Sequence, residues 1–520
     1  SGEFNTAVGY SALELNTTGD KNVSVGHKAL EANTTANDNT AVGTAALKAN
    51  TTGGANTSTG RDSLSTNTTG SDNVAYGVES LQSNTTASNN TAVGYRSLRA
   101  NTTGADNTAV GNNALDACTT GEGNVAVGKH ALGSHIGGNN NVAIGKDAAQ
   151  ANTSAGQNVA IGYNALYTED TQGSLTAVGS QSMYKNNGGS QNTALGVSAS
   201  YHNVSGNHNT AVGYTALHNN TGSNNTSIGN NALNSNTTGV QNVAIGSLAL
   251  DANTTRHDNV AVGYRALSNQ SIADRNTAVG SNAMYANTEG EYNVAVGAFA
   301  LDSNTTADNN TAVGYVALNL NTTGFEHVAV GANALDANTT GERNTAIGYD
   351  ALTSNTTGDA NTAIGQKAGG GITTGDENLL LGAVAGFEIT TGSNNICLGK
   401  GAGRTSSPSG QITTGDNKIC LGNNSHTDAF IKIALTVTSD ERDKTDIQDI
   451  TTGLDFVNQL KPKSFWFRKN RDSNEKHGEK RYGFYAQDIL ALEGSDSVII
   501  DSKDSDNLKF KGDQLIPILV

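Results

Sequence analysis

A glycine closes a five-residue motif, Asn-Thr/Val-Ala-Val/Ile-Gly, that returns at a fixed interval along most of this chain. Gly9, Gly26 and Gly43 set the interval, which holds as far as Gly399 except for one shorter step, from Gly213 to Gly229. A longer last step reaches Gly422, and the extra residues around Thr405–Gln411 are expected to form a loop. A constant period over about twenty-five copies indicates a stacked repeat architecture.

Each repeat has the pattern of a short β-strand followed by turns. The opening motif alternates, with Thr/Val and Val/Ile on one side and Ala on the other. The Ala-Leu that follows predicts a second short strand, and the later Asn-Thr-Thr-Gly has turn chemistry, because Gly accepts positive φ. Such a unit makes one coil of a β-solenoid, advancing about 4.8 Å per coil, in which aligned Asn side chains bond along the stack.

The composition of one coil predicts that the chain does not act alone. Each coil contains one Val or Ile, one Leu and otherwise small or polar residues, which is little apolar area against the entropy of ordering its whole backbone. The invariant small Ala predicts that its face of the strand is covered by a second copy. We therefore expect a homo-oligomer wound around a common axis.

Several copies read Asn-Val-Ala-Ile-Gly, as at Asn141–Gly145, Asn158–Gly162 and Asn242–Gly246. These copies resemble the head repeat of YadA-like trimeric adhesins, although the period here is longer. The resemblance covers about residues 5–425 and implies a parallel β-roll that trimerises. The expected fold class is an all-β, trimeric β-solenoid shaft over residues 1–425.

The chain changes character after the last repeat. Residues 426–438 form an apolar connector of strand type, and from there to 520 Lys, Arg and Asp increase and the one Trp appears. We expect this small α+β segment to contain a helix with Leu454, Val457 and Leu460 on one face. The helix, two strands and a charged loop are expected at Thr452–Leu460, Ser464–Arg468, Tyr482–Ala486 and Asn470–Lys480, respectively.

Four ordered motifs in residues 439–520 resemble the endosialidase-type intramolecular chaperone found at the end of phage tail fibres and tailspikes. They are Ser439–Lys444, Gly453–Phe456 with Leu460–Pro462, Gly483–Asp488 and Leu515–Leu519. The resemblance implies a domain that trimerises, templates the fibre and then cleaves itself off. That family continues into a helical coiled coil, so a chain ending at Val520 is expected to carry a truncated domain.

The same resemblance places a self-cleavage site immediately before Ser439, with Ser439 as nucleophile and Lys444 as the assisting amine. A serine hydroxyl needs a nearby base, and a lysine serves when its pKa is lowered. The alternative is that Ser439 caps a helix whose first turn holds Asp440 and Glu441. In the self-cleavage interpretation, the only catalysis is one autoproteolytic turnover, with no external substrate.

The sequence gives little support for nucleic-acid binding, membrane insertion, or a metal or cofactor site. The net charge of −16 excludes a basic face for nucleic acid or anionic membranes, and no apolar run is long enough to span a bilayer. No secretory signal, zinc spacing, P-loop or Rossmann fingerprint is present, so we expect no cofactor and no metal. Cys397 and Cys420 share one slot of successive repeats, and we expect buried thiols there in preference to a disulfide.

Repeated surface positions suggest further ligands. Tyrosines that follow the repeat glycine, such as Tyr95 and Tyr163, are either tolerated surface residues, which we favour, or a row that stacks on sugars. Asn-Thr-Thr matches the glycosylation pattern but is explained by the turn. The Thr columns raise an ice-binding alternative.

The sequence therefore predicts an extracellular fibre shaft of a phage tail fibre or similar appendage, acting as a homotrimer that attaches to a host receptor, with a glycan as one candidate class. The chaperone segment has a structural purpose in this scheme, because a slip of one repeat returns nearly identical residues to contact and leaves the register poorly defined. The alternatives are a YadA-like cell-surface adhesin and an ice- or glycan-binding coat protein.

Overall fold

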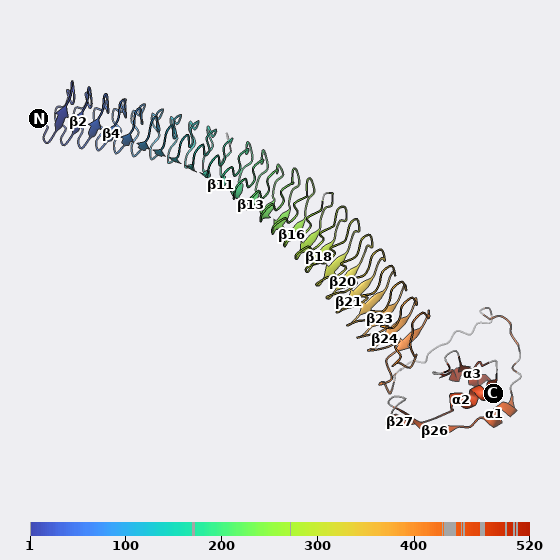
Figure 1. Cartoon of the computed structure of the whole chain (residues 1–520). Coiled ribbons are helices and arrows are strands. Elements are labelled where there is room, and N and C mark those ends of the chain that lie inside the picture. The colour runs from blue at the N-terminus through green and yellow to red at the C-terminus, as the bar shows by residue number, and fades with distance from the viewer. Residues whose placement is uncertain are drawn as a thin grey trace. The chain divides into compact units, whose positions relative to one another are not determined.

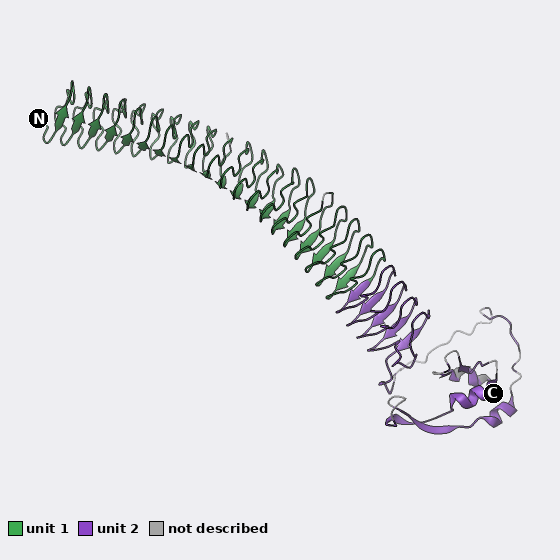
Figure 2. Cartoon of the chain, in the orientation of Figure 1, with its two compact units in different colours: residues 1–344 green, residues 345–520 purple. Residues whose placement is uncertain are grey.

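The fold is described from a computed structural model of the chain, in which the Cα positions divide into two compact units, residues 1–344 and 345–520 (Figures 1 and 2). Each unit is described by itself. The structure describes residues 2–168, 172–270, 272–428, 430, 442, 444–448, 450, 453–468, 474–494, 497–502, 505 and 508–519.

Unit 1 is a stack of coils that each contribute one three-residue strand to a parallel sheet. Consecutive strands pair in register, so that Ala92 lies opposite Ala109 and Ala109 opposite Ala126. Figure 1 shows the coils following one another in chain order. The strands are β1 (Thr6–Val8), β2 (Val23–Val25), β3 (Thr40–Val42), β4 (Thr57–Thr59), β5 (Val74–Tyr76), β6 (Thr91–Val93), β7 (Thr108–Val110), β8 (Val125–Val127), β9 (Val142–Ile144), β10 (Val159–Ile161), β11 (Thr176–Val178), β12 (Thr193–Leu195), β13 (Thr210–Val212), β14 (Thr226–Ile228), β15 (Val243–Ile245), β16 (Val260–Val262), β17 (Thr277–Val279), β18 (Val294–Val296), β19 (Thr311–Val313) and β20 (Val328–Val330).

The coil interior is narrow and partly polar. In the coil that begins at β6, the fully buried side chains include Ala92 of the strand, Leu98 of the following turn, and Asn101 and Asn107. The predicted alternation along the strand is therefore confirmed, but the prediction that a second copy covers the Ala face is wrong. Ala packs inside its own coil, since only a small side chain fits where the chain folds back within so short a repeat.

The predicted second strand at Ala-Leu is also absent from the described coils. This segment is a tight turn in which Arg96 and Leu98 have φ of 54° and 52°, a left-handed conformation that is costly for residues with a Cβ atom. The backbone is held by the adjacent coils instead: Arg96 N donates to Val78 O at 3.0 Å and Leu98 N to Ala114 O at 2.9 Å. The Ala-Leu turn is therefore hydrogen-bonded to the adjacent coils although its backbone is not in a β conformation.

Two ladders of buried asparagine run through the coils. In the first ladder, the backbone N–H of Asn107 donates to Asn90 Oδ1 at 3.0 Å, and Asn90 Nδ2 donates to Gly104 O at 3.0 Å. In the second, Asn84 Nδ2 donates to Asn67 Oδ1 at 2.8 Å. An amide offers both a donor and an acceptor, so each Asn continues the chain of bonds into the next coil. The predicted Asn stacking is confirmed.

The repeat glycine is required by the close approach of coils. Gly94 has φ of 131°, and a Cβ atom built there would lie 2.5 Å from Gly111 O of the next coil. No side chain fits at that separation, and the φ value is one that other residues rarely adopt. The glycine that defines the sequence period is therefore a packing requirement of the stack.

Unit 2 contains further coils with the same parallel pairing. Their strands are β21 (Thr345–Ile347), β22 (Thr362–Ile364), β23 (Leu379–Leu381), β24 (Ile396–Leu398) and β25 (Ile419–Leu421). Here the interior changes: Leu380 replaces the usual Ala, and glycines stand where Leu occurs in other coils. A Cβ atom at Gly369 would lie 2.7 Å from Leu380 Cδ1, so the two exchanges compensate in volume.

The rest of unit 2 is a small α+β region. It contains α1 (Leu454–Gln459), α2 (Ala486–Glu493) and α3 (Gly512–Leu519), a hairpin of β26 (Lys463–Arg468) and β27 (Lys476–Gly483), and a second antiparallel pair, β28 (Ile500–Asp501) and β29 (Lys509–Phe510). The three helices are the only ones among the described residues. The predicted all-β solenoid with a small α+β C-terminal region is confirmed, whereas trimerisation stays a prediction.

Local predictions in this region were met in part. The predicted helix and first strand correspond to α1 and β26, but Phe456 is the buried residue of α1 and Leu454 is exposed. Residues 470–473 of the predicted charged loop lie outside the described residues, and the loop is wrong from Lys476, where β27 begins. The predicted second strand is correct only at Tyr482 and Gly483, the end of β27, and is wrong at Ala486, which begins α2. Most residues of β27 are exposed to solvent, so a strand here tolerates the charges that suggested a loop.

We predict that Gln270→Asn stabilises unit 1. Gln270 occupies a position of the second ladder, but its longer side chain bonds to Ala273 O, and the buried Asn253 Oδ1 has no hydrogen-bond partner among the described residues. An Asn there can donate to Asn253 Oδ1 and accept from Asn287 Nδ2. The free energy of unfolding should rise by about 1 kcal/mol, measured by thermal unfolding and by amide exchange in the flanking coils.

The matched control is Gln270→Ala, which removes the amide without restoring the ladder and should lower the free energy of unfolding by about 1–3 kcal/mol. Equal stability of the two variants would show that continuity of the ladder contributes nothing at this position.

Candidate functional sites: the strand face and the C-terminal segment

The strands present one face to the outside of the coils, made of the first and third residues of each strand; we call it the outward strand face. From β2 to β25 the middle residue is always buried, while its two neighbours are half-buried or exposed. Ile144 and Ile245, for example, are 39% and 37% exposed. The coil interior thus lies on one side of the sheet and the outward strand face on the other.

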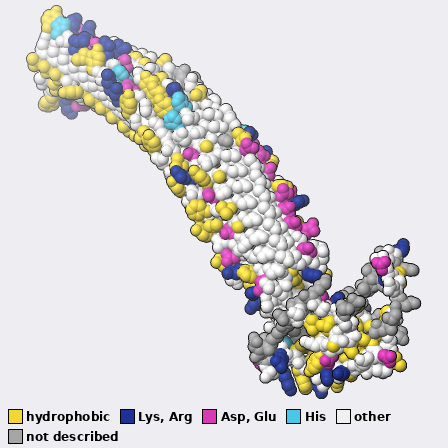
Figure 3. All heavy atoms as spheres, turned by 45° about the vertical axis from the view of Figure 1, so that its right-hand side comes forward, with side chains coloured by type: hydrophobic (Ala, Val, Ile, Leu, Met, Phe, Trp, Pro, Cys, Tyr) yellow, Lys and Arg dark blue, Asp and Glu magenta, His cyan; other side chains and the backbone are white. Residues whose placement is uncertain are grey.

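The outward strand face is uncharged throughout. Its two positions in the 25 strands are occupied only by Thr, Val, Ile, Leu and one Tyr, Tyr76. Solvent-facing sheet surfaces normally carry polar side chains at these positions, and 15% of the whole chain is charged. On the face drawn in Figure 3, hydrophobic side chains form rows along the coils, and charged side chains lie in separate groups. An extended stripe with no charged residue, in which Val, Ile and Leu outnumber Thr, is typical of an interaction surface.

Exposed tyrosines follow the repeat glycine in several coils, and several of them carry a cation over the ring. The Arg96 guanidinium lies 4.9 Å from the Tyr95 ring centroid, and Lys146 Nζ lies 5.4 Å from that of Tyr163. Each cation–π contact covers one ring face. These rings are therefore less available for stacking on a sugar than their exposure suggests.

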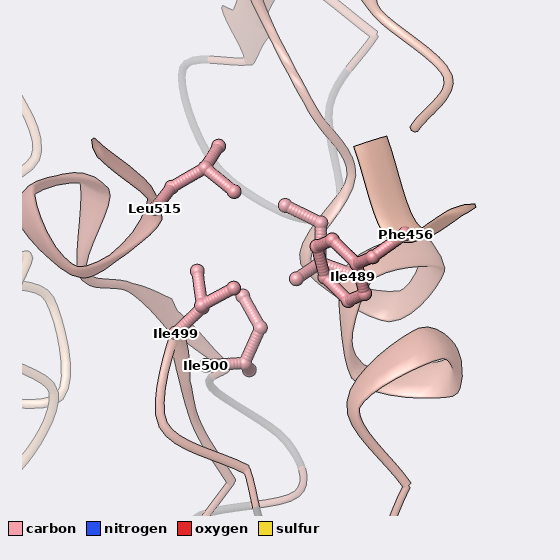
Figure 4. Packing of buried hydrophobic residues seen from close by; sticks show 5 residues of the cluster. All are labelled: Phe456, Ile489, Ile499, Ile500 and Leu515. Carbon is pink, nitrogen blue, oxygen red and sulfur yellow. The ribbon is translucent and has the colours of Figure 1, made fainter. Parts of the chain in front are cut away.

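A second site lies in the C-terminal region, which has a small core. Phe456 of α1, Ile489 of α2, Ile499 and Ile500 at β28, and Leu515 of α3 are its buried residues (Figure 4). The Glu493 carboxylate, at the end of α2, accepts hydrogen bonds from the backbone N–H groups of Val498, Ile499 and Ile500. These bonds hold the start of β28 against the end of α2.

Beside this core, β26, β27 and β29 line a pocket of about 570 Å³ whose walls are mainly aromatic. Phe467, Tyr482, Tyr485 and Phe510 line it and are all substantially exposed. Arg481 is the one charged lining residue, with its guanidinium 5.7 Å from the Phe467 ring centroid. The sequence prediction missed this pocket, because its walls combine residues of β26, β27 and β29 with Phe484–Ala486 and Leu508, which are far apart in the sequence.

Ser439, the predicted nucleophile, lies outside the described residues, as does most of the predicted connector 426–438. Lys444 is exposed and lies in the segment before α1. The self-cleavage prediction is therefore untested by the geometry of this region.

Comparison with known proteins identifies the C-terminal region. Residues 439–496 match the family model described as "Chaperone of endosialidase". No curated protein and no solved structure matched the chain. None of the described helices has the length and apolar character needed to cross a membrane.

A long β-solenoid of short, regular coils joined to such a domain defines a class of protein: a structural fibre with an intramolecular chaperone. Within this chain, the chaperone of the endosialidase type is the segment that includes residues 439–496.

We predict that charging the outward strand face abolishes self-association. In the double variant Ile245→Lys and Val262→Lys, two lysines enter neighbouring strands, and burying them against another chain would cost several kcal/mol. Both side chains lie outside the coil interior, so the solenoid should keep its far-ultraviolet circular dichroism. After residues 439–520 have been removed from the assembled particle, light scattering should show the mass of a single shaft chain in place of a multiple of it.

The double variant Thr238→Lys and Thr255→Lys is the matched control, because these exposed turn residues of neighbouring coils add the same two charges outside the strand face. An unchanged particle mass in the strand-face double variant, or a wild-type particle of one chain, would contradict this use of the stripe.

Proposed function

We propose that this protein is the shaft of a phage tail fibre, a parallel homotrimer that extends from the virion and attaches it to a host surface. The observation that carries the proposal is the uncharged outward strand face on a solenoid that ends in a chaperone segment of the endosialidase type. The work of such a shaft is mechanical reach, with no external substrate, no cofactor and no metal.

The size of the outward strand face supports side-by-side association of chains. Two residues along a strand span about 6.6 Å, and twenty coils about 4.8 Å apart extend for about 95 Å. The resulting stripe of about 600 Å² approaches the roughly 800 Å² that each partner contributes to a standard stable interface. Three such stripes around one axis would cover one another, leaving the charged turns in solvent.

The chaperone segment answers a problem that the repeat creates. A shift of one chain by one coil places Thr, Val and Ile opposite nearly the same residues, so the stripe alone selects its register weakly. A globular trimer at residues 439–520, after the connector 426–438, would start all three chains at the same coil. Winding then propagates along the shaft of residues 1–425 from coil to coil.

Maturation by self-cleavage before Ser439 fits this scheme. The Ser439 hydroxyl would attack the Thr438 carbonyl carbon, with the Lys444 amine accepting its proton. The amide bond between Thr438 and Ser439 would break as Lys444 returns the proton to the Ser439 nitrogen, leaving an ester that water then hydrolyses to a carboxylate and the free Ser439 hydroxyl. Removal of the template after winding leaves the shaft kinetically trapped, because unwinding and rewinding no longer have a fixed start.

The receptor would be a host-surface molecule, with a glycan as one chemical class, and the location would be extracellular. The second candidate function is a YadA-like cell-surface adhesin, favoured by the Asn-Val-Ala-Ile-Gly copies such as Asn141–Gly145. The two differ in where the protein is found: purified virions would contain a tail fibre, whereas isolated cell envelopes would contain an adhesin.

We predict that deletion of residues 439–520 prevents assembly of the shaft. The remaining solenoid keeps its stripe but lacks a starting register, so chains should pair out of step and aggregate. Soluble trimer, measured by size-exclusion chromatography with light scattering, should fall to a small fraction of the full-length yield. A normal yield of trimer would refute the templating role.

We predict that Ser439→Ala blocks cleavage without blocking assembly. On a denaturing gel the wild type should give two fragments that separate before Ser439, and the variant one band of 53.2 kDa. Lys444→Ala should slow cleavage strongly, whereas Lys461→Ala, a change at another exposed lysine, should leave it unaffected. Identical banding in wild type and Ser439→Ala would exclude self-cleavage at this site.

A further inference from the structure

Two of the three cysteines occupy the same slot of consecutive coils. Cys397 is the middle residue of β24 and Cys420 the middle residue of β25, and their Cα atoms are direct partners in the parallel pairing. Both side chains point into the coil interior, are 0% and 3% exposed, and are free thiols. Most other coils have Ala in this slot, so adjacent thiols are a local feature of these two coils.

The spacing of these strands suits a disulfide. Neighbouring strands lie about 4.8 Å apart, inside the range of about 4.4–6.8 Å that disulfides require between Cα atoms. The Cβ atoms must come within about 4.5 Å, so a small approach of the strands is needed. Among the described strands β25 pairs with β24 alone, so it has freedom to make that approach.

The loop of the longer last step, around Pro408, encloses both sulfur atoms. A Cβ atom at Gly403 would lie 2.7 Å from Cys397 Sγ, and the backbone N–H of Gly403 donates to Cys420 Sγ at 3.0 Å. Ser409 Oγ lies 3.0 Å from Cys420 Sγ. Both sulfur atoms therefore lie against one residue that has no side chain to hold them apart.

We infer that Cys397 and Cys420 are a modification site, at which a reversible disulfide joins the last two described coils when the protein meets a low-molecular-weight disulfide such as oxidised glutathione. The Cys420 thiolate attacks one sulfur of that disulfide, forming a mixed disulfide and releasing one small thiolate. Both steps require β25 to open from β24, since the two thiols are buried in the closed stack. Cys397 then loses its proton and attacks Cys420 Sγ, and the second small thiolate leaves and takes up a proton. Two cysteine thiols are oxidised, and one small disulfide is reduced to two thiols.

The crosslink would close a ring that contains the inserted loop around Pro408, so it would resist opening of β25 from the stack. Burial beside Cys420 raises the pKa of the Cys397 thiol to about 12, so little thiolate is present at neutral pH. Formation of the bond should accordingly speed up as the pH rises toward that value, since the thiolate is the reacting form.

The test uses the full-length folded protein incubated with oxidised glutathione at mildly alkaline pH. Free thiols should fall from three to one per chain, and peptide mapping without reductant should recover the segments containing Cys397 and Cys420 as one crosslinked species. Proteolysis within residues 404–410 should slow, and a reductant should reverse both effects.

Two variants keep the inference falsifiable. Cys397→Ala installs the residue found in most other coils, and it should abolish the crosslink while leaving the fold intact. Cys118→Ser, which changes the cysteine without a cysteine neighbour, should still form the bond and retain no free thiol. Retention of three thiols by the treated wild type, or a Cys420 crosslink between two chains, would overturn the inference.

Discussion

The hydrogen bonds between one coil and the next hold this protein together, because a single coil has almost no core of its own. In the coil that begins at β6 the interior contains one leucine, small residues and two asparagines. Backbone groups of the strand and of the following turn bond to the adjacent coils, and the buried Asn side chains bond in the same direction. Stability therefore belongs to the stack and increases with the number of coils in it.

This dependence explains residues that would be unfavourable elsewhere. Leu98 has a left-handed backbone, a conformation that is disfavoured for residues with a Cβ atom, but its N–H donates across to Ala114 and its side chain is fully buried. Asn101 would be expensive to bury alone, yet its Nδ2 reaches both Asn84 Oδ1 and Gly104 O at 2.9 Å. Where the ladder stops at Cys118, Asn101 Oδ1 is left without a hydrogen-bond partner, which shows that continuity satisfies the buried amides.

The two sides of each solenoid strand carry different types of residue. The inward side carries small residues because the coil closes over it, whereas the outward side carries Thr, Val and Ile that the coil cannot cover. The C-terminal region differs from the coils, because it has a compact core of its own around Phe456 and Ile489 and an aromatic pocket beside that core. In the proposed trimer, lateral contact would stabilise the shaft, and the chaperone segment of the endosialidase type would set its register.

The sequence by itself determined the period, the solenoid class, the asparagine stacking and the nature of the C-terminal segment, since each depends on residue types that recur at fixed spacing or on motifs in fixed order. It could not decide which side of the Thr-Ala-Val strand is the interior, because alternation is symmetric until the closure of the coil is known. It could not decide that Ala-Leu is a turn, because the bonds that hold Leu98 in its left-handed conformation come from another coil. The sequence also could not show three other features: the pocket at Phe467 and Tyr482, the hydrogen bonds to the Glu493 carboxylate, and the pairing of Cys397 with Cys420. Each depends on contacts between segments that are distant in sequence or in different coils, and only the tertiary structure sets the geometry of such contacts.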